Sequence, residues 1–184
     1  MGIPDAIDFV REGGSIFGVF AAERHIPDIE NLLFEHGSNE WNHLPEDDVR
    51  RHVGAIASGN TLAVIAASSK VDGIIGVVTY ELGHKYPQYQ PEGRRDSEHG
   101  YIAEAVVHPD FTGRDIGTAL LSSAIRDLTE AGLREVYAKR HADNIPSKRM
   151  MEKAGMVIVD EFADPEIRPT GSRRTAVMRF VVEG

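Results

Sequence analysis

Glu104 is the side chain in this sequence that is best placed for acid–base chemistry. It interrupts an apolar run from Tyr101 to Val107 that predicts a buried strand. Apolar surroundings raise the pKa of a carboxyl group, and such a carboxylate suits general-base work, often through a water molecule. The other interpretation is a carboxylate at the solvent-exposed end of the strand, paired with an arginine or hydrogen-bonded to backbone donors. Glu81, at the end of the preceding predicted strand, is the reserve candidate for the base.

A short loop with two glycines follows this strand and leads into a helix. Pro109 cannot donate to a sheet ladder and should end the strand, and apolar residues recur at helical spacing from Ile116 onward. The start of a helix presents unpaired backbone N–H groups and a partial positive charge, so residues 112–118 are predicted to bind an anion, usually phosphate. An ordinary turn is the alternative. The sequence does not match the Walker motif, and Gly113 and Gly117 do not have the spacing of a dinucleotide-binding fingerprint.

Two blocks of sequence resemble the GCN5-related N-acetyltransferases, the GNAT family. Val107-x-Pro109 followed by Thr-Gly-Arg-Asp-Ile-Gly-Thr-Ala-Leu-Leu at 112–121 is similar to the family's acyl-CoA loop. Asn-Ile-Pro-Ser at 144–147 with Met-Glu-Lys-Ala-Gly-Met at 151–156 is similar to the family's Asn-x-x-Ala/Ser and Tyr-Glu-Lys-x-Gly-Phe. A predicted helix and strand separate the blocks, as in the family.

The resemblance implies an acyl-CoA-dependent N-acetyltransferase with acetyl-CoA as co-substrate, moving an acetyl group to a primary amine by direct attack in a ternary complex. Val107 should present its main chain to the pantetheine, and Asn144 should lie near the pantetheine or the thioester. Gly117 has no side chain to block the approach of phosphates to the backbone. The residues expected to wrap the pyrophosphate are Thr112, Gly113, Arg114, Asp115, Ile116, Gly117 and Thr118.

Three positions depart from the family pattern. Thr112 stands where Arg or Gln is usual, and Asp115 stands where the first glycine belongs. Asp tolerates the left-handed backbone that the turn needs, and its charged side chain should face away from a pyrophosphate. Met151 replaces a tyrosine that often serves as the family's acid, and a thioether cannot donate a proton. These departures keep open an alternative function, a non-catalytic acyl-CoA-binding or regulatory module of the same fold.

The acceptor side is less clear from the sequence. Trp41, His43 and Tyr80 are candidates to line an acceptor pocket, although Trp41 also suits a partly buried anchor. The irregular stretch from Gly83 to Gly100 is long for a compact domain, and we expect it to belong to the acceptor side and to be mobile without substrate. The eight histidines form no metal-ligand spacing, so no metal is expected.

The hydrophobic pattern predicts one α/β domain over residues 1–184, with residues 1–14 as a loose lead-in. The order β-α-α-β-β-β-α-β-α-β-β predicts one central mixed (α+β) sheet of about seven strands, with helices on both faces. By resemblance, the family's fourth and fifth strands should splay apart and admit the pantetheine arm. The strands are predicted at Ser15 to Ala22, Thr61 to Ala67, Gly73 to Leu82, Tyr101 to Val107, Arg134 to Lys139, Val157 to Phe162 and Thr175 to Val182.

Composition limits the remaining classes of function. The chain has 184 residues and no cysteine, which excludes disulfides and thiolate nucleophiles. A net charge of −9 disfavours nonspecific nucleic-acid binding, and no apolar run approaches membrane-spanning length. A cytoplasmic enzyme that acts on a small-molecule or peptide amine is expected, with no nucleic-acid or membrane partner. The edge strands near the C-terminus leave a homodimer possible.

Overall fold

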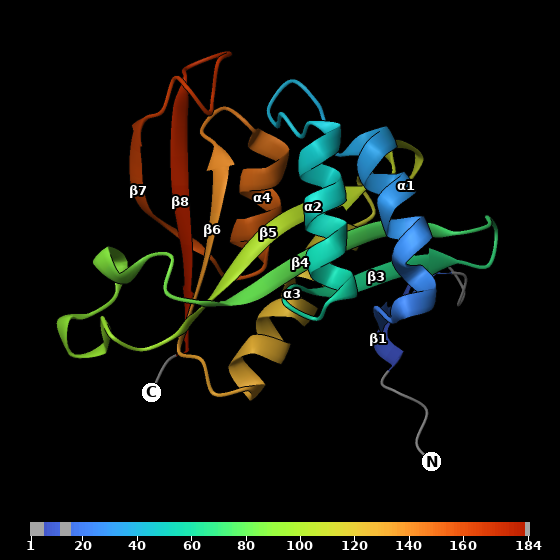
Figure 1. The fold of residues 1–184 in the computed structure, drawn as a ribbon, viewed down its shortest axis with the longest axis horizontal. Coiled ribbons are helices and arrows are strands. Elements are labelled where there is room, and N and C mark those ends of the chain that lie inside the picture. Colours follow the sequence, from blue (N-terminus) through green and yellow to red (C-terminus); the bar gives the residue numbers. More distant parts are fainter. Residues whose placement is uncertain (1–5, 12–15, 183–184) are drawn as a thin grey trace.

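An eight-stranded mixed sheet organises the computed structural model, which describes residues 6–11 and 16–182 (Figure 1). The strand order is β1-β2-β3-β4-β5-β6-β8-β7, and β5–β6 is the parallel pair among otherwise antiparallel neighbours. The predicted mixed sheet is confirmed. The strands are β1 Ala6–Arg11, β2 Ile16–Phe20, β3 Leu62–Ser68, β4 Ile74–Gly83, β5 His99–Val107, β6 Glu135–His141, β7 Val157–Ala163 and β8 Arg174–Val181.

The eighth strand corrects the prediction of a loose lead-in. Ala6–Arg11 pairs with β2 in antiparallel register, with Ala6 opposite Val19. Its sequence, Ala-Ile-Asp-Phe-Val-Arg, contains the β-branched and aromatic residues Ile7, Phe9 and Val10, which strands favour. The rest of the predicted lead-in, residues 1–5 and 12–14, lies outside the described residues.

Helices cover both faces of the sheet, as predicted. α1 (Ile26–His36) and α2 (Glu46–Ala57) lie on one face, and α3 (Ile116–Glu130) and α4 (Ile145–Lys153) pack in the core on the other (Figure 1). α2 begins with three acids, which suit the positive end of a helix. One apolar cluster includes Ile29, Leu33, Val49, Val53, Ile65 and Val77, and the second includes Leu120, Leu121, Leu128, Val136, Met151 and Met178.

The parallel pair β5–β6 separates after three residues. Only Gly100, Tyr101 and Ile102 pair with β6, although β5 continues to Val107. The end of β5 therefore has one edge bonded to β4 and the other edge open. This matches the splayed pair of strands that the family resemblance implied.

The connection between β4 and β5 makes specific contacts with the rest of the fold, and its mobility without substrate stays a prediction. Tyr86 and Gln90 are buried, and the Tyr86 N–H donates to Nε2 of buried His99 over 2.9 Å. Tyr89 donates its hydroxyl to Asp160 of β7 over 2.5 Å. Aromatic packing and hydrogen bonds thus hold this connection on the β6–β8 part of the sheet, which its Pro and Gly content did not indicate.

Candidate active site

A β-bulge on β5 turns Glu104 toward the face of the sheet that α1 and α2 cover. Thr79 of β4 pairs with Glu104, but its neighbour Tyr80 pairs with Ile102, so Ala103 has no opposite residue. Side chains alternate between the two faces along a strand, and one extra residue reverses that alternation. Ile102 therefore packs in the core with α3, whereas Glu104 points to the opposite face, where the α1–α2 connection reaches it.

The Glu104 carboxylate lies in a partly buried polar contact. Asn42, from the connection between α1 and α2, donates Nδ2 to Glu104 Oε2 over 3.2 Å. Burial raises the pKa of Glu104 to about 7, and the Asn42 hydrogen bond and the charge of Arg168 partly oppose that rise. The predicted raised pKa is confirmed. A carboxylate with this pKa is well matched to accept a proton near neutral pH.

Tyr101 brings the groups around Glu104 into one cluster. Burial raises the pKa of its phenol and a hydrogen bond with Tyr86 lowers it; smaller effects come from the charges of Glu104 and Glu81, which raise the pKa, and of Arg168, which lowers it. Two carboxylates and one guanidinium therefore act on the same hydroxyl group. We call Asn42, Glu81, Tyr101, Glu104 and Arg168 the acceptor-side cluster.

His52 on α2 contacts the bulge through the side chain of Thr79. Thr79 Oγ1 accepts a hydrogen bond from the Glu104 backbone N–H over 3.0 Å and lies 2.8 Å from Nε2 of His52. Burial lowers the pKa of His52 and keeps it neutral near pH 7. The backbone that carries the candidate base is thereby tied to α2. His52 and Thr79 are far apart in the sequence, and no motif indicates this contact.

Glu81, the reserve base, lies in a different electrostatic setting. Burial acts to raise its pKa, but the hydrogen bond and charge of Lys85 and the hydrogen bond from Thr61 outweigh it and lower the pKa. Lys85 Nζ is 2.7 Å from Glu81 Oε2. A carboxylate held ionised by a lysine is a weak proton acceptor, so the structure favours Glu104 over Glu81.

The loop predicted to hold the pyrophosphate precedes α3 and has the backbone that its motif required. Gly113 has φ +74° and Asp115 has φ 59°, both in the left-handed region. The prediction that Asp115 tolerates this conformation is confirmed. Asp115 Oδ1 is 2.6 Å from Nζ of Lys153 on α4, which compensates its charge.

The side chains of this loop mostly contact the protein itself. Ile116 is buried in the core, Thr112 donates its hydroxyl to the Pro109 carbonyl over 2.8 Å, and the Arg114 guanidinium lies 5.2 Å from the Phe111 ring centroid. The backbone of residues 112–118 is therefore the part suited to bind a phosphate, and the first N–H groups of α3 lack intrahelical partners.

Gly117 also allows close packing between elements of the fold. A Cβ atom at this position would lie 2.8 Å from Met150 Sδ on α4 and 3.5 Å from Val107 Cγ2. The missing side chain thus leaves room for packing among α3, α4 and β5. This packing is a second reason for a glycine here, and its role in the approach of phosphates stays a prediction.

Val107 lies at the open edge of β5. The N–H of the following residue, His108, donates to Ile75 on the β4 side over 2.9 Å. Because successive residues of a strand direct their backbone groups to opposite edges, the N–H and C=O of Val107 and of Ala105 point to the side where β6 has separated. This is the edge along which a pantetheine arm was expected.

The second motif forms the start and the core of α4. Asn144 caps the helix by accepting from the Ser147 N–H over 3.0 Å, and its role at the thioester stays a prediction. Met151, in the position of the family's tyrosine, is buried among apolar side chains.

The three residues predicted to line an acceptor pocket are not brought together. Tyr80 is 1% exposed, packs in the core with α3 and donates its hydroxyl to Asp127 over 2.6 Å. The prediction for Tyr80 is wrong: its side chain lies on the α3 face of the sheet, whereas Thr79 and Glu104 lie on the face that α1 and α2 cover. Trp41 packs on His141 with ring centroids 4.8 Å apart, and its carbonyl accepts from Arg168 over 3.2 Å, so it borders the acceptor-side cluster.

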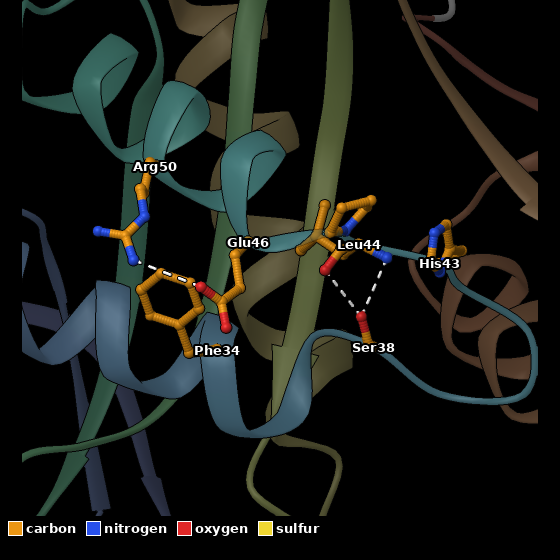
Figure 2. Close-up of a pocket in the computed structure, with 7 residues that line it drawn as sticks. Phe34, Ser38, His43, Leu44, Glu46 and Arg50 are labelled. Atoms are coloured by element: carbon orange, nitrogen blue, oxygen red, sulfur yellow. Dashed lines mark hydrogen bonds and ion pairs between the residues drawn. The ribbon is translucent and has the colours of Figure 1, made fainter.

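His43 lines a separate shallow hollow at the ends of α1 and α2 (Figure 2). There the Ser38 hydroxyl bonds both backbone groups of Leu44, and Glu46 and Arg50 pair beside Phe34. The hollow measures about 440 Å³, and neither Glu104 nor any residue of the 112–118 loop lines it. His43 therefore lines this hollow and not the site of the candidate base. Its neighbour Asn42 is the residue of this connection that hydrogen-bonds Glu104.

The chain matches the model of the Acetyltransferase (GNAT) family over residues 26–156. The chain belongs to the GNAT family. The membership in this family that the two motifs implied is thereby confirmed.

Similar proteins include several acetyltransferases. A ribosomal-protein-S5-alanine acetyltransferase from Vibrio fischeri superposes with a TM-score of 0.68 at 14% identity, covering 95% of this chain and 97% of that chain. NAA60 from Arabidopsis thaliana, in complex with acetyl-CoA, gives a TM-score of 0.73 at 14% identity over 92% of this chain and 100% of that one. A mycothiol acetyltransferase from Nocardiopsis dassonvillei is 32% identical over 100 residues, a match that spans 43% of this chain and 30% of that relative's length.

No helix in the described part of the chain is long and apolar enough to cross a membrane. Within residues 6–11 and 16–182, no group of three His, Asp or Glu side chains is arranged to hold a metal ion.

Proposed function

We propose that this chain transfers an acetyl group from acetyl-CoA directly to a primary amine, with both substrates bound at once and Glu104 as the general base. The observation that carries the proposal is the position and pKa of Glu104. Its carboxylate has a pKa of about 7 and lies on the strand whose far edge opens toward the predicted pantetheine path. The names of the similar proteins refer to different acceptors, so the acceptor must be inferred from this chain's own residues.

The acceptor amine is mostly protonated at neutral pH and must lose a proton before it can attack. Glu104 takes this proton, directly or through a water molecule. The free amine then attacks the thioester carbonyl carbon and a C–N bond forms. The nitrogen loses its second proton to solvent, the C–S bond breaks, and CoA leaves as the thiolate. The outward N–H groups of Ala105 and Val107 on the open edge of β5 are suited to stabilise the oxyanion that forms in between.

No acid from α4 is required in this scheme. Met151 is buried and its thioether cannot donate a proton. A thiolate is a far better leaving group than an amine and departs without prior protonation. Glu104 afterwards releases its proton to solvent, which returns the enzyme to its starting state.

Glu104→Gln tests the proposal, with Glu81→Gln as the matched control. CoA release across an amine panel should fall by about ten- to ten-thousand-fold in kcat/KM for Glu104→Gln, the usual range for a lost general base. The wild-type rate should rise through one ionisation near pH 7, the pKa of Glu104, and the variant should lack that rise. Glu81→Gln should retain most activity. Full activity in Glu104→Gln, with acetyl-CoA still bound, would remove Glu104 from the mechanism.

A further inference from the structure

Arg168 forms no ion pair with a carboxylate of the described residues, and it binds the α1–α2 connection that also contacts the candidate base. It comes from the connection between β7 and β8, where its Nε donates to Thr175 Oγ1 and its Nη1 donates to the Trp41 carbonyl, each over 3.2 Å. None of the ion pairs formed by the described residues includes it. Both of its hydrogen-bond partners are neutral oxygen atoms, which orient the guanidinium without cancelling its charge.

Two other cations near Arg168 do form ion pairs with carboxylates. Lys85, also on the acceptor side, is 2.7 Å from a carboxylate oxygen of Glu81. Arg174, at the other end of the same connection as Arg168, is 2.7 Å from Glu161. A partly buried cation that lacks a counter-charge costs free energy. Of these three cations, Arg168 is the one that has no carboxylate within ion-pair distance among the described residues. The carboxylate of Asp164 belongs to the same hydrogen-bond network, but it accepts from the Thr175 hydroxyl over 2.7 Å and not from Arg168.

Its charge reaches the acceptor-side cluster. Arg168 lowers the pKa of Glu104 and of Tyr101, against the larger effect of burial in each case. A guanidinium has five N–H donors in a rigid fork that matches a carboxylate, and two of the five are used here. The α1–α2 connection links the two groups, because the carbonyl of Trp41 accepts from Arg168 and the amide of the next residue, Asn42, donates to Glu104.

We infer that the acceptor amine carries a carboxylate near its reacting nitrogen, and that Arg168 binds this carboxylate while Glu104 takes the proton from the amine. The inference rests on the proposed transfer to an amine and specifies its substrate class, a free amino acid. The half-buried rings of Tyr101 and Trp41 border the carbon skeleton between the two charged ends. A peptide N-terminus or a polyamine lacks a carboxylate in that position.

The test compares free L-amino acids with their C-terminal amides as acceptors. The amide is the weaker base and has more free amine at neutral pH, so a preference for the acid cannot arise from basicity. Wild-type kcat/KM should favour the acids. Arg168→Gln should reduce that preference by about 10- to 100-fold, the effect of losing one charge-assisted hydrogen bond, and Arg168→Lys should retain part of it. Arg174→Gln is the matched control and should keep the wild-type preference.

Several results would overturn the inference. Equal or faster turnover of the amides, turnover confined to amines without a carboxylate such as spermidine or tyramine, or an unchanged preference in a folded Arg168→Gln variant each contradicts it. Calorimetric binding of the acids and the amides to enzyme saturated with CoA separates the two proposals. Tighter binding of acids that depends on Arg168, without any acetyl transfer, would support this inference and contradict the proposed function.

Discussion

On the α3 side of the sheet, the predicted pyrophosphate site consists of the backbone of residues 112–118, a continuous stretch whose side chains pack within the protein. On the α1 and α2 side, the acceptor-side cluster consists of side chains from two loops and two strands, spread from Asn42 to Arg168. The first site depends on chain conformation, so a local motif describes it. The second depends on which elements the fold brings together, so no local motif describes it. Its side chains are the ones we expect to determine which acceptor binds.

The stability of Glu104→Gln against pH gives the largest effect with which to test this contrast. Because the folded pKa is raised from 4.5 to about 7, the unfolded chain loses its proton first as pH rises, and wild-type stability falls between these two values. Glutamine has no such ionisation. The variant should therefore gain stability relative to wild type across this window, on the order of 2–3 kcal/mol, as measured by urea unfolding at pH 4 and pH 8.

Glu81→Gln provides a control of opposite sign. The pKa of Glu81 is lowered, so its contribution to stability is present at neutral pH and is lost as pH falls through the folded pKa. This variant should be less stable than wild type at pH 8 and should approach it in acid. If both variants responded to pH in the same direction, the electrostatic distinction between the two carboxylates would be wrong.

Gly117→Val tests the cofactor side. The new side chain would meet Met150 Sδ, so we expect a loss of about 1–3 kcal/mol of stability from overpacking and weaker acetyl-CoA binding through displacement of α4. Adding Met150→Ala should restore much of both, because it removes the contacting atom. Recovery of stability without recovery of acetyl-CoA binding would show that Gly117 serves the phosphates after all.

The sequence predicted the mixed sheet, the loop before α3, the left-handed Asp115 and the raised pKa of Glu104, because each follows from a contiguous pattern. It did not predict the partners of Glu104, since Asn42 and Arg168 lie about 60 residues away on either side and are brought near it by the fold. Tyr80 was misassigned for a related reason, because one bulge at Ala103 determines which side chains share a face with Glu104.

Asn42→Ala should change activity by a smaller factor. The Asn42 hydrogen bond lowers the pKa of Glu104, so its loss should raise that pKa and shift the rising limb of the rate to higher pH. We expect about a two- to tenfold lower rate at pH 7, the effect of one hydrogen bond, with the rate at high pH unchanged. Asn42→Asp should shift the limb further, because a like charge raises the pKa. A shift in the opposite direction in either variant would contradict this account.

Tyr80→Phe should have the smallest effect on activity and is the clearest check on the corrected face of β4. The Tyr80 hydroxyl donates to Asp127 on α3 over 2.6 Å, and the ring lies in the core, on the other side of the sheet from Glu104. Removing the hydroxyl leaves the Asp127 carboxylate without this donor, which should cost about 1–3 kcal/mol of unfolding free energy. Because the ring and its packing remain, kcat/KM and the preference among acceptors should stay within about twofold of wild type, well inside the effect of one hydrogen bond. Pairing Tyr80→Phe with Asp127→Leu should recover part of the lost stability, since both polar partners are then gone. A change of acceptor preference in Tyr80→Phe without loss of stability would place Tyr80 back in the acceptor pocket and would contradict the role of the bulge at Ala103.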